Sequence, residues 1–256
     1  MKRNKRILIF RFTHDVLRIT RYDVPMTDIA SNVRSVLQTI HDVAVQAGRD
    51  PQSLQLVAVT KYVDAECVRQ AIAAGITICG ENRLQEAQAK MKTIGSCPDL
   101  TWHFIGRLQR RKLKSIVGQF SLIHSVDSLE HVEEIHRRAE EQQRLQSILL
   151  QVNVGNEATK GGFPPAQLLE VLPAIGKFSH VKVCGLMAIP PRAEEPESMR
   201  PYFRTLKTLA DEGTALHISG IELKELSMGM SNDYVVAIQE GATMVRIGSA
   251  LFGNRL

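Results

Sequence analysis

A lysine that directly follows a short apolar run has the most distinctive chemistry in this sequence. Lys61 closes the run Val57-Ala58-Val59-Thr60. At the end of a buried strand a desolvated ammonium has a lowered pKa, and the free amine condenses with an aldehyde to give a Schiff base. The alternative is that Lys61 extends to solvent where the strand ends, and position alone does not separate the two.

A glycine-serine pair near the end of the sequence suits an anionic ligand. Gly248-Ser249 is expected to open the last helix, where backbone N–H groups lack intrahelical acceptors and bind phosphate. Ser227 and Gly229, at the end of the preceding strand, would supply the neighbouring wall. The alternative is that Gly248 only permits a tight turn and Ser249 only caps a helix.

An arginine lies inside the last apolar run, where Arg246 is flanked by Val245 and Ile247. Because side chains alternate along a strand, either Arg246 or its two neighbours face the inside of the fold. An inward guanidinium is costly without a partner, which indicates a ligand or an acidic residue beside it. An ion pair with an outer helix is the other possibility, and the pattern leaves both open.

Two further polar residues at strand ends, His103 and Asn82, carry weaker signals. A histidine between Trp102 and Phe104 is typical of a hydrogen-bonded core residue, and Asn82 is typical of a turn. The sequence has no cluster with metal-ligand spacing and no nucleophile elbow. We therefore predict no metal site and assign no catalytic residue.

These residues fall at the ends of apolar runs that alternate with amphipathic helices. One helical stripe, for example, contains Leu129, Val132, Ile135 and Ala139, and Asp127 is its expected N-cap. The runs are nearly continuous in apolar residues, as in strands that are covered on both faces. The predicted strands are Leu54–Lys61, Ile76–Asn82, Leu100–Gly106, Ser121–Asp127, Ser147–Val154, Val181–Ile189, Lys224–Gly229 and Thr243–Gly248.

Eight such units predict a single (β/α)₈ barrel, whose active sites gather at the carboxyl ends of the strands. A doubly wound open sheet is the less favoured alternative. It often carries a glycine fingerprint after the first strand, whereas Thr60-Lys61-Tyr62 occupies that place here.

Composition limits the class of protein. The chain has 256 residues, of which 44% are hydrophobic and 5% aromatic, and 4 cysteines without paired spacing, which fits a globular protein in a reducing compartment. No apolar run is long enough to cross a membrane. The net charge of +5 arises entirely within residues 1–25, so the remaining residues are balanced and we expect no nucleic-acid partner.

The first 25 residues differ from the rest, with mixed charge and one short apolar run. We expect residues 1–25 to be a disordered extension or to precede a true start at Met26, and residues 26–256 to form the barrel domain. The segment has no convincing address signal, so the expected location is the cytoplasm. A lone barrel with balanced charge is expected to be a monomer.

Taken together, several strings of this sequence resemble the pyridoxal phosphate homeostasis proteins, the YggS/PROSC-type family. They occur in family order and cover about residues 27–253, and the Ser-Met-Gly-Met-Ser string is highly specific. The matching strings are Leu56–Lys61, Gly80–Arg83, Trp102–Gly106, His124–Asp127, Gln151–Asn153, Gly185–Met187, Ser227–Ser231 with Asp233, and Val245–Gly248.

The resemblance implies a barrel like the N-terminal domain of alanine racemase, with pyridoxal 5′-phosphate (PLP) at its mouth. Lys61 matches the family's Schiff-base lysine, and Arg246 matches the arginine that faces the pyridine nitrogen. The other cofactor-binding positions that the resemblance implies are Ser227, Gly248 and Ser249 around the phosphate, Met228 and Gly229 in the same string, and Asn82 and His103 at strand ends near the cofactor.

This set of residues favours a protein that holds PLP over one that turns over a substrate. Arg246 can only donate, so it keeps the pyridine nitrogen unprotonated and weakens the ring as an electron sink. The chain also ends soon after the eighth strand, without room for the added domain of a racemase. We expect a PLP homeostasis protein that buffers PLP or delivers it to PLP-dependent apoenzymes. The alternatives are a PLP-dependent amino-acid racemase and a barrel enzyme acting on a phosphorylated sugar.

Overall fold

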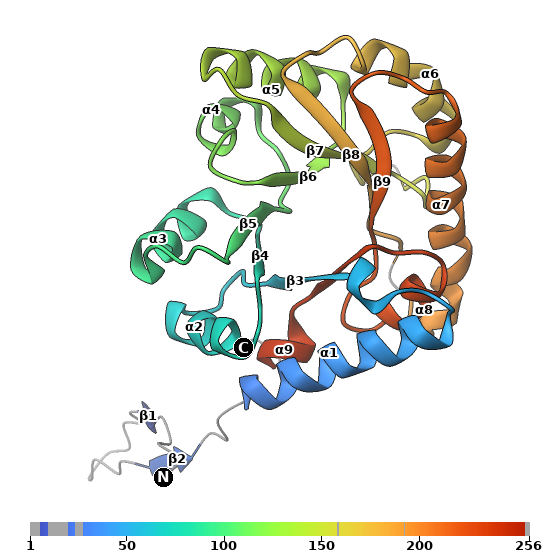
Figure 1. Cartoon of the computed structure of the whole chain (residues 1–256). Helices are drawn as coiled ribbons and strands as arrows, with labels where there is room; N and C mark the ends of the chain where they lie inside the picture. Colours follow the sequence, from blue (N-terminus) through green and yellow to red (C-terminus); the bar gives the residue numbers. More distant parts are fainter. Residues whose placement is uncertain (1–5, 10–19, 24–27, 158, 192, 254–256) are drawn as a thin grey trace.

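Eight parallel strands close into a barrel, which confirms the predicted fold (Figure 1). The computed structural model describes residues 6–9, 20–23, 28–157, 159–191 and 193–253. Strand β10 pairs with β3 and closes the ring, with Arg246 beside Val57, so the open-sheet alternative is wrong. The barrel strands are β3 (Gln55–Val59), β4 (Ile78–Glu81), β5 (Thr101–Phe104), β6 (Leu122–Val126), β7 (Gln146–Val152), β8 (Val181–Ala188), β9 (Ile221–Ser227) and β10 (Met244–Ile247).

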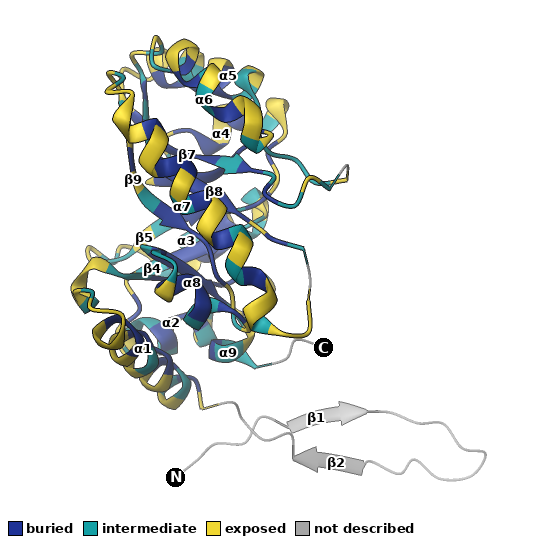
Figure 2. Ribbon diagram, turned by 90° about the vertical axis from the view of Figure 1, so that its right-hand side faces the viewer, coloured by how far each residue is buried: buried dark blue, intermediate teal, exposed yellow. Residues whose placement is uncertain are grey.

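Helices surround the barrel, each with one face buried against it (Figure 2). The helices are α1 (Ile29–Gln46), α2 (Ala65–Ala73), α3 (Leu84–Ile94), α4 (Leu113–Ile116), α5 (Leu129–Glu141), α6 (Pro165–Ile175), α7 (Arg200–Ala215), α8 (Tyr234–Gln239) and α9 (Ser249–Phe252). The described residues also contain the short 3-10 helices η1 (Pro51–Ser53), η2 (Arg110–Lys112) and η3 (Pro196–Met199). None of the described helices combines the length and apolar character needed to cross a lipid bilayer.

The N-cap of helix α5 is Ser128, one residue after the expected cap Asp127. The Ser128 hydroxyl, not Asp127, accepts a hydrogen bond from the His131 N–H at 3.3 Å. The Asp127 carboxylate instead lies 2.6 Å from the ring nitrogen Nδ1 of His131. Both residues are good caps, and the contact to the histidine ring explains why the serine takes that position.

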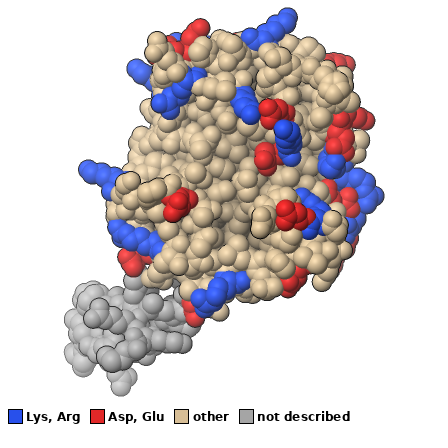
Figure 3. All heavy atoms as spheres, in the orientation of Figure 1, with Lys and Arg blue, Asp and Glu red and all other residues tan. Residues whose placement is uncertain are grey.

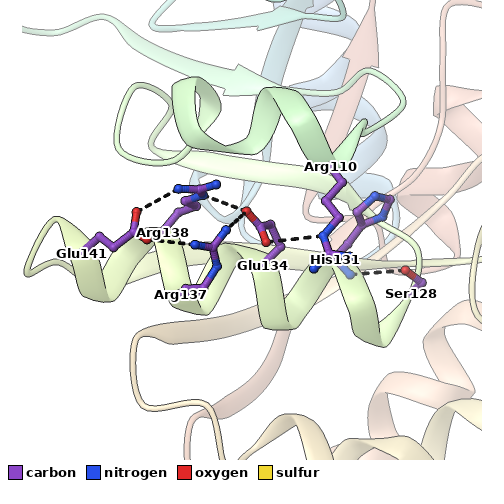
Figure 4. Close-up of polar contacts among 7 residues, drawn as sticks. All are labelled: Arg110, Ser128, His131, Glu134, Arg137, Arg138 and Glu141. Carbon is purple, nitrogen blue, oxygen red and sulfur yellow. Dashed lines mark hydrogen bonds and ion pairs between the residues drawn. The ribbon is translucent and has the colours of Figure 1, made fainter.

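A buried carboxylate on α5 gathers three arginines (Figure 4). Glu134 is 4% exposed and lies 2.6 Å from Arg137 and 2.7 Å from Arg138 on the same helix. Arg110, in η2, reaches the same carboxylate at 3.5 Å. One residue of the basic run 110–114, Arg110, is therefore held against α5 by an ion pair.

The barrel interior has an apolar layer and, nearer the carboxyl ends of the strands, a polar one. The apolar layer is a cluster separate from the outer core: Val57, Leu122, Leu149, Met187 and Met244. Neighbours along a strand, such as Leu56 and Ala58, belong to the larger core between strands and helices. Because side chains alternate along a strand, this separation identifies the residues that face the barrel axis. The polar layer follows two residues later, with His124 after Leu122 and Arg246 after Met244.

Strands β1 (Arg6–Ile9) and β2 (Thr20–Asp23) pair antiparallel in a sheet separate from the barrel. The other residues of the expected extension, and Met26, lie outside the described residues. The division of the chain at residue 26 therefore stays a prediction.

Candidate functional site

Lys61 follows the last rung of strand β3. The Thr60 N–H donates to the Gly80 carbonyl at 3.0 Å, which continues the ladder one residue beyond Val59. Val57 faces the barrel axis, and alternation from Val57 puts Lys61 on the same side. Tyr62, with φ at 59°, turns the chain away immediately afterwards. Lys61 is half-buried, and its amine has no hydrogen bond or ion pair with any described residue.

The residue before Lys61 is held from the outer side of the barrel. The Thr60 hydroxyl donates to Glu81 Oε1 at 2.6 Å, and the Lys90 amine on α3 donates to the same oxygen at 2.6 Å. Lys90 also donates to the Thr60 carbonyl at 2.5 Å. Since this cluster of Thr60, Glu81 and Lys90 draws Thr60 toward α3, the next side chain, Lys61, is directed to the barrel side.

Arg246 lies inside the barrel, so the outer ion pair considered from the sequence is wrong. Its Nη1 atom donates to the carbonyl and the hydroxyl of Ser227, at 2.7 Å each, and Nη2 donates to the Ala188 carbonyl at 2.9 Å. Of the five N–H groups of a guanidinium, two therefore have no acceptor among the described residues. Burial lowers the pKa of Arg246 to about 10, with Asp233 acting in the opposite direction.

Two neutral histidines continue this polar layer. His124 Nδ1 lies 2.9 Å from Ser227 Oγ, and His124 Nε2 lies 3.0 Å from His103 Nδ1. Burial lowers the pKa of His103 to about 4 and, with the nearby His103 and Arg246, lowers the pKa of His124 well below its usual value. The expectation of a hydrogen-bonded core histidine at position 103 is confirmed, and its partner is a second histidine.

Asn82 presents an unused acceptor. Its side-chain oxygen Oδ1 is buried and has no hydrogen-bond partner among the described residues. A buried polar atom without a partner costs about 1–3 kcal/mol, and such groups are satisfied by a ligand in many binding sites. Asn82 follows β4, beside β3, which places it in the same sector of the barrel as Lys61.

The loop after β9 requires glycine at position 229. Gly229 has a φ of +89°, and an added Cβ would lie 2.6 Å from the Ala237 side chain. The Gly229 carbonyl accepts a hydrogen bond from the Arg246 N–H at 3.0 Å. The side chain of Met228 is fully buried in the outer core, so only its backbone could contact a ligand at the mouth.

The turn into α9 has an acceptor that the sequence prediction did not include. The hydroxyl of Ser231 lies 3.3 Å from the N–H groups of both Gly248 and Ala250 and accepts from each. Gly248 is the N-cap and Ser249 is exposed without a capping bond, so the alternative in which Ser249 only caps the helix is wrong. These amide groups converge on one oxygen, as phosphate-binding turns do.

A pocket of about 200 Å³ opens at the carboxyl ends of β5 to β8. Both signs of charge line it, with Arg107 and Lys160 opposite in sign to Asp127. The predicted site residues do not line this pocket; they lie on β3, β4, β5, β9 and β10 or directly after them. Over the described part of the face in Figure 3, charged residues of both signs are scattered without a patch of one sign.

Comparisons with known proteins point to one family. The alanine racemase N-terminal domain family matches residues 31–255. A pyridoxal phosphate homeostasis protein of Aquifex aeolicus is 45% identical over 220 residues, which are 86% of this chain and 95% of that protein. This chain belongs to the pyridoxal phosphate homeostasis protein family.

Two further relatives of the family agree with this assignment. The pyridoxal phosphate homeostasis protein of Pseudomonas aeruginosa is 41% identical over 231 residues, which are 90% of this chain and 97% of that protein. The structure of PipY from Synechococcus elongatus PCC7942 with PLP bound matches with a TM-score of 0.77 at 37% identity. That match covers 88% of this chain and 100% of PipY.

Several residues of the site were not singled out from the sequence. His124 lies in the string His124–Asp127, which resembles the family, but the sequence analysis assigned it no binding role. A histidine within an otherwise apolar strand could have indicated a polar residue inside the barrel. Ser231 also belonged to a quoted string. The hydrogen bond from Lys90 to the Thr60 carbonyl joins residues 30 positions apart in the sequence, and no local sequence pattern predicts it.

Proposed function

We propose that this chain holds PLP at the mouth of the barrel through a Schiff base to Lys61. Two neighbouring strands carry the proposal. Lys61, whose amine has no partner among the described residues, lies on the barrel side after β3, and Arg246 points inward from β10. PLP supplies an electrophilic aldehyde, a pyridine ring and a phosphate. Lys61 would bind the aldehyde carbon, and the two unused N–H groups of Arg246 are the donors for the ring nitrogen.

Three features of this chain fit PLP. Asn82 Oδ1 is a buried acceptor without a partner in the described part of the chain, and a polar ligand would satisfy it. The Ser231 hydroxyl, which accepts from the N–H groups of Gly248 and Ala250, marks the turn at which we expect the phosphate to bind. The Gly229 position, which no side chain fits, lets the backbone approach closely.

The role we propose is holding and supplying PLP rather than transforming an amino acid. Arg246 donates only, so it favours an unprotonated ring nitrogen and a weak electron sink. His103 and His124 are bound to each other and keep low pKa values, which makes them poor proton carriers near neutral pH. The names of the relatives also favour homeostasis over racemisation.

In this role the chain would buffer free PLP and pass it to PLP-dependent apoenzymes. We propose that it acts as a monomer in the cytoplasm and that residues 1–25 are an extension outside the barrel. The balanced charge of residues 26–256 supports the absence of a nucleic-acid partner.

Absorbance spectroscopy of the purified chain mixed with PLP tests the proposal. We expect a visible imine band, and after borohydride reduction a pyridoxyl adduct on Lys61 in a peptide mass map. Lys61→Ala should lose the band, whereas Lys114→Ala, which changes an exposed lysine, should keep it. An adduct on another lysine, or a normal band in Lys61→Ala, would refute the assignment. Turnover of L-alanine or L-serine to the D-isomer above the Lys61→Ala background would refute the holding role.

A further inference from the structure

A buried hydrogen-bond chain crosses the barrel interior from β10 to β5. Arg246 Nη1 lies 2.7 Å from Ser227 Oγ, and Ser227 Oγ lies 2.9 Å from His124 Nδ1. The chain ends where His124 Nε2 lies 3.0 Å from His103 Nδ1. Ser227 and His124 have no exposed surface, and His103 and Arg246 are 5% exposed. Four strands of the barrel, β5, β6, β9 and β10, each contribute one residue.

The direction of each bond follows from the arginine, because a guanidinium only donates. Arg246 therefore occupies an acceptor position of Ser227 Oγ. Among the described residues, His124 Nδ1 is the one acceptor within reach of the Ser227 hydroxyl proton, and a buried hydroxyl without a partner is costly. Ser227 thus donates to His124 Nδ1.

The two histidines extend the same direction. Burial keeps both rings neutral near neutral pH, and a neutral imidazole carries one proton. Since His124 Nδ1 accepts, its proton is on Nε2 and is donated to His103 Nδ1. The proton of His103 is then on Nε2, and no described residue accepts a hydrogen bond from that atom.

We propose that His124 is a positioning residue that locks His103 in the tautomer with its proton on Nε2, so that His103 offers a neutral hydrogen-bond donor to an anionic oxygen of the bound ligand. The identity of that ligand rests on the proposed function, since PLP carries phenolate and phosphate oxygens. A neutral donor in a fixed tautomer costs no reorganisation when the ligand binds, because the proton is already in place. Arg246, at the other end, sets the direction of every hydrogen bond in this series. The donors that Arg246 and His103 offer to a ligand are therefore fixed before the ligand binds.

Nuclear magnetic resonance of the ligand-free full chain tests the tautomer directly. With ¹⁵N-labelled histidine, two-bond ¹H–¹⁵N correlation spectra distinguish a proton on Nδ1 from a proton on Nε2. We expect the Nε2–H form for both His103 and His124 near pH 7. The matched variants are His124→Leu, which removes the donor, and His124→Gln, whose amide restores one; His41→Leu changes an exposed histidine as the control.

His124→Leu should give His103 a mixture of tautomers, and His124→Gln should return it to the Nε2–H form. The affinity for PLP should fall by up to about tenfold in His124→Leu, the effect of losing one hydrogen bond, and should remain close to that of the unchanged protein in His124→Gln and His41→Leu. A proton on Nδ1 of His103 in the unchanged protein would overturn the proposal, even where His124→Leu does not fold. An unaltered His103 tautomer in a folded His124→Leu variant would overturn it as well. Because the spectra need no ligand, they stand apart from the proposed function, which fails separately where PLP forms no adduct with Lys61.

Discussion

Removing the amine of Lys90 is the sharpest perturbation of the support behind Lys61. Lys90 donates to Glu81 Oε1 at 2.6 Å and to the Thr60 carbonyl at 2.5 Å, and Glu81 has no exposed surface. In Lys90→Met the apolar stem remains, but the Glu81 carboxylate keeps only the Thr60 hydroxyl. Breaking a buried ion pair from one side costs about 3–5 kcal/mol. At roughly 2–4 °C per kcal/mol for a domain of this size, the melting temperature should fall by about 6–20 °C.

Urea denaturation and calorimetry measure this loss, with Lys92→Met on the same helix as the control. Lys92 is exposed, so its substitution should change the free energy of unfolding by about 0.5 kcal/mol or less. Adding Glu81→Leu to Lys90→Met should recover most of the loss, because removing both charges of a buried pair is often neutral. Imine formation with PLP should also be slower in Lys90→Met, since the peptide before Lys61 loses its anchor. Equal stability of Lys90→Met and Lys92→Met would refute the reasoning.

Two further substitutions or conditions report on other parts of the site. The unfolded chain binds protons on His103 and His124 below pH 6.5 while the folded chain does not, because burial lowers the pKa of His103 to about 4 and lowers the pKa of His124 well below its usual value. The free energy of unfolding should therefore fall as the pH falls from 6.5 toward 4, by about 3 kcal/mol from His103 alone. Urea titrations at several pH values check this. The same dependence of stability on pH in a His103→Gln/His124→Gln variant would contradict it. Gly229→Ala should lower the free energy of unfolding by about 1–3 kcal/mol, because its Cβ would lie 2.6 Å from the Ala237 side chain. Gly48→Ala is the control, since Gly48 has a similar φ of +68° but open space around it, and should cost less. Thermal unfolding of the two variants compares them.

The sequence predicts the barrel because each strand is a nearly continuous apolar run covered on both faces. The predicted and observed strands overlap throughout, and the largest offset is at β9, which begins at Ile221 rather than Lys224. The missed part alternates with charge, since Glu222 is paired with Lys182 of β8 at 3.3 Å and lies outside the apolar pattern. The apolar pattern of the sequence therefore predicts the buried part of a strand better than the charged residues at its start.

The side on which Arg246 lies could not be obtained from its own strand. Alternation leaves two solutions, and the choice between them depends on which neighbours face the axis. Met244 two residues earlier belongs to the interior cluster, while Val245 and Ile247 belong to the outer core. That information requires the packing of the whole barrel. The bond between His124 and Ser227 spans 103 residues of sequence, which is equally beyond any local pattern.

Lys90 and Arg246, the two buried cations among the described residues, have opposite kinds of surroundings, and this difference separates their roles. Lys90 faces a carboxylate, so its charge is compensated within the protein and its function is to hold the strand end before Lys61. Arg246 faces two carbonyls and a hydroxyl, and its desolvation is offset only in part by Asp233. An inward cation without a contacting carboxylate favours an electron-rich or anionic ligand. Under the proposed function, the ion pair of Lys90 positions the strand end that carries Lys61, and the charge of Arg246 is available to the ligand, which suits the retention of a phosphorylated aldehyde.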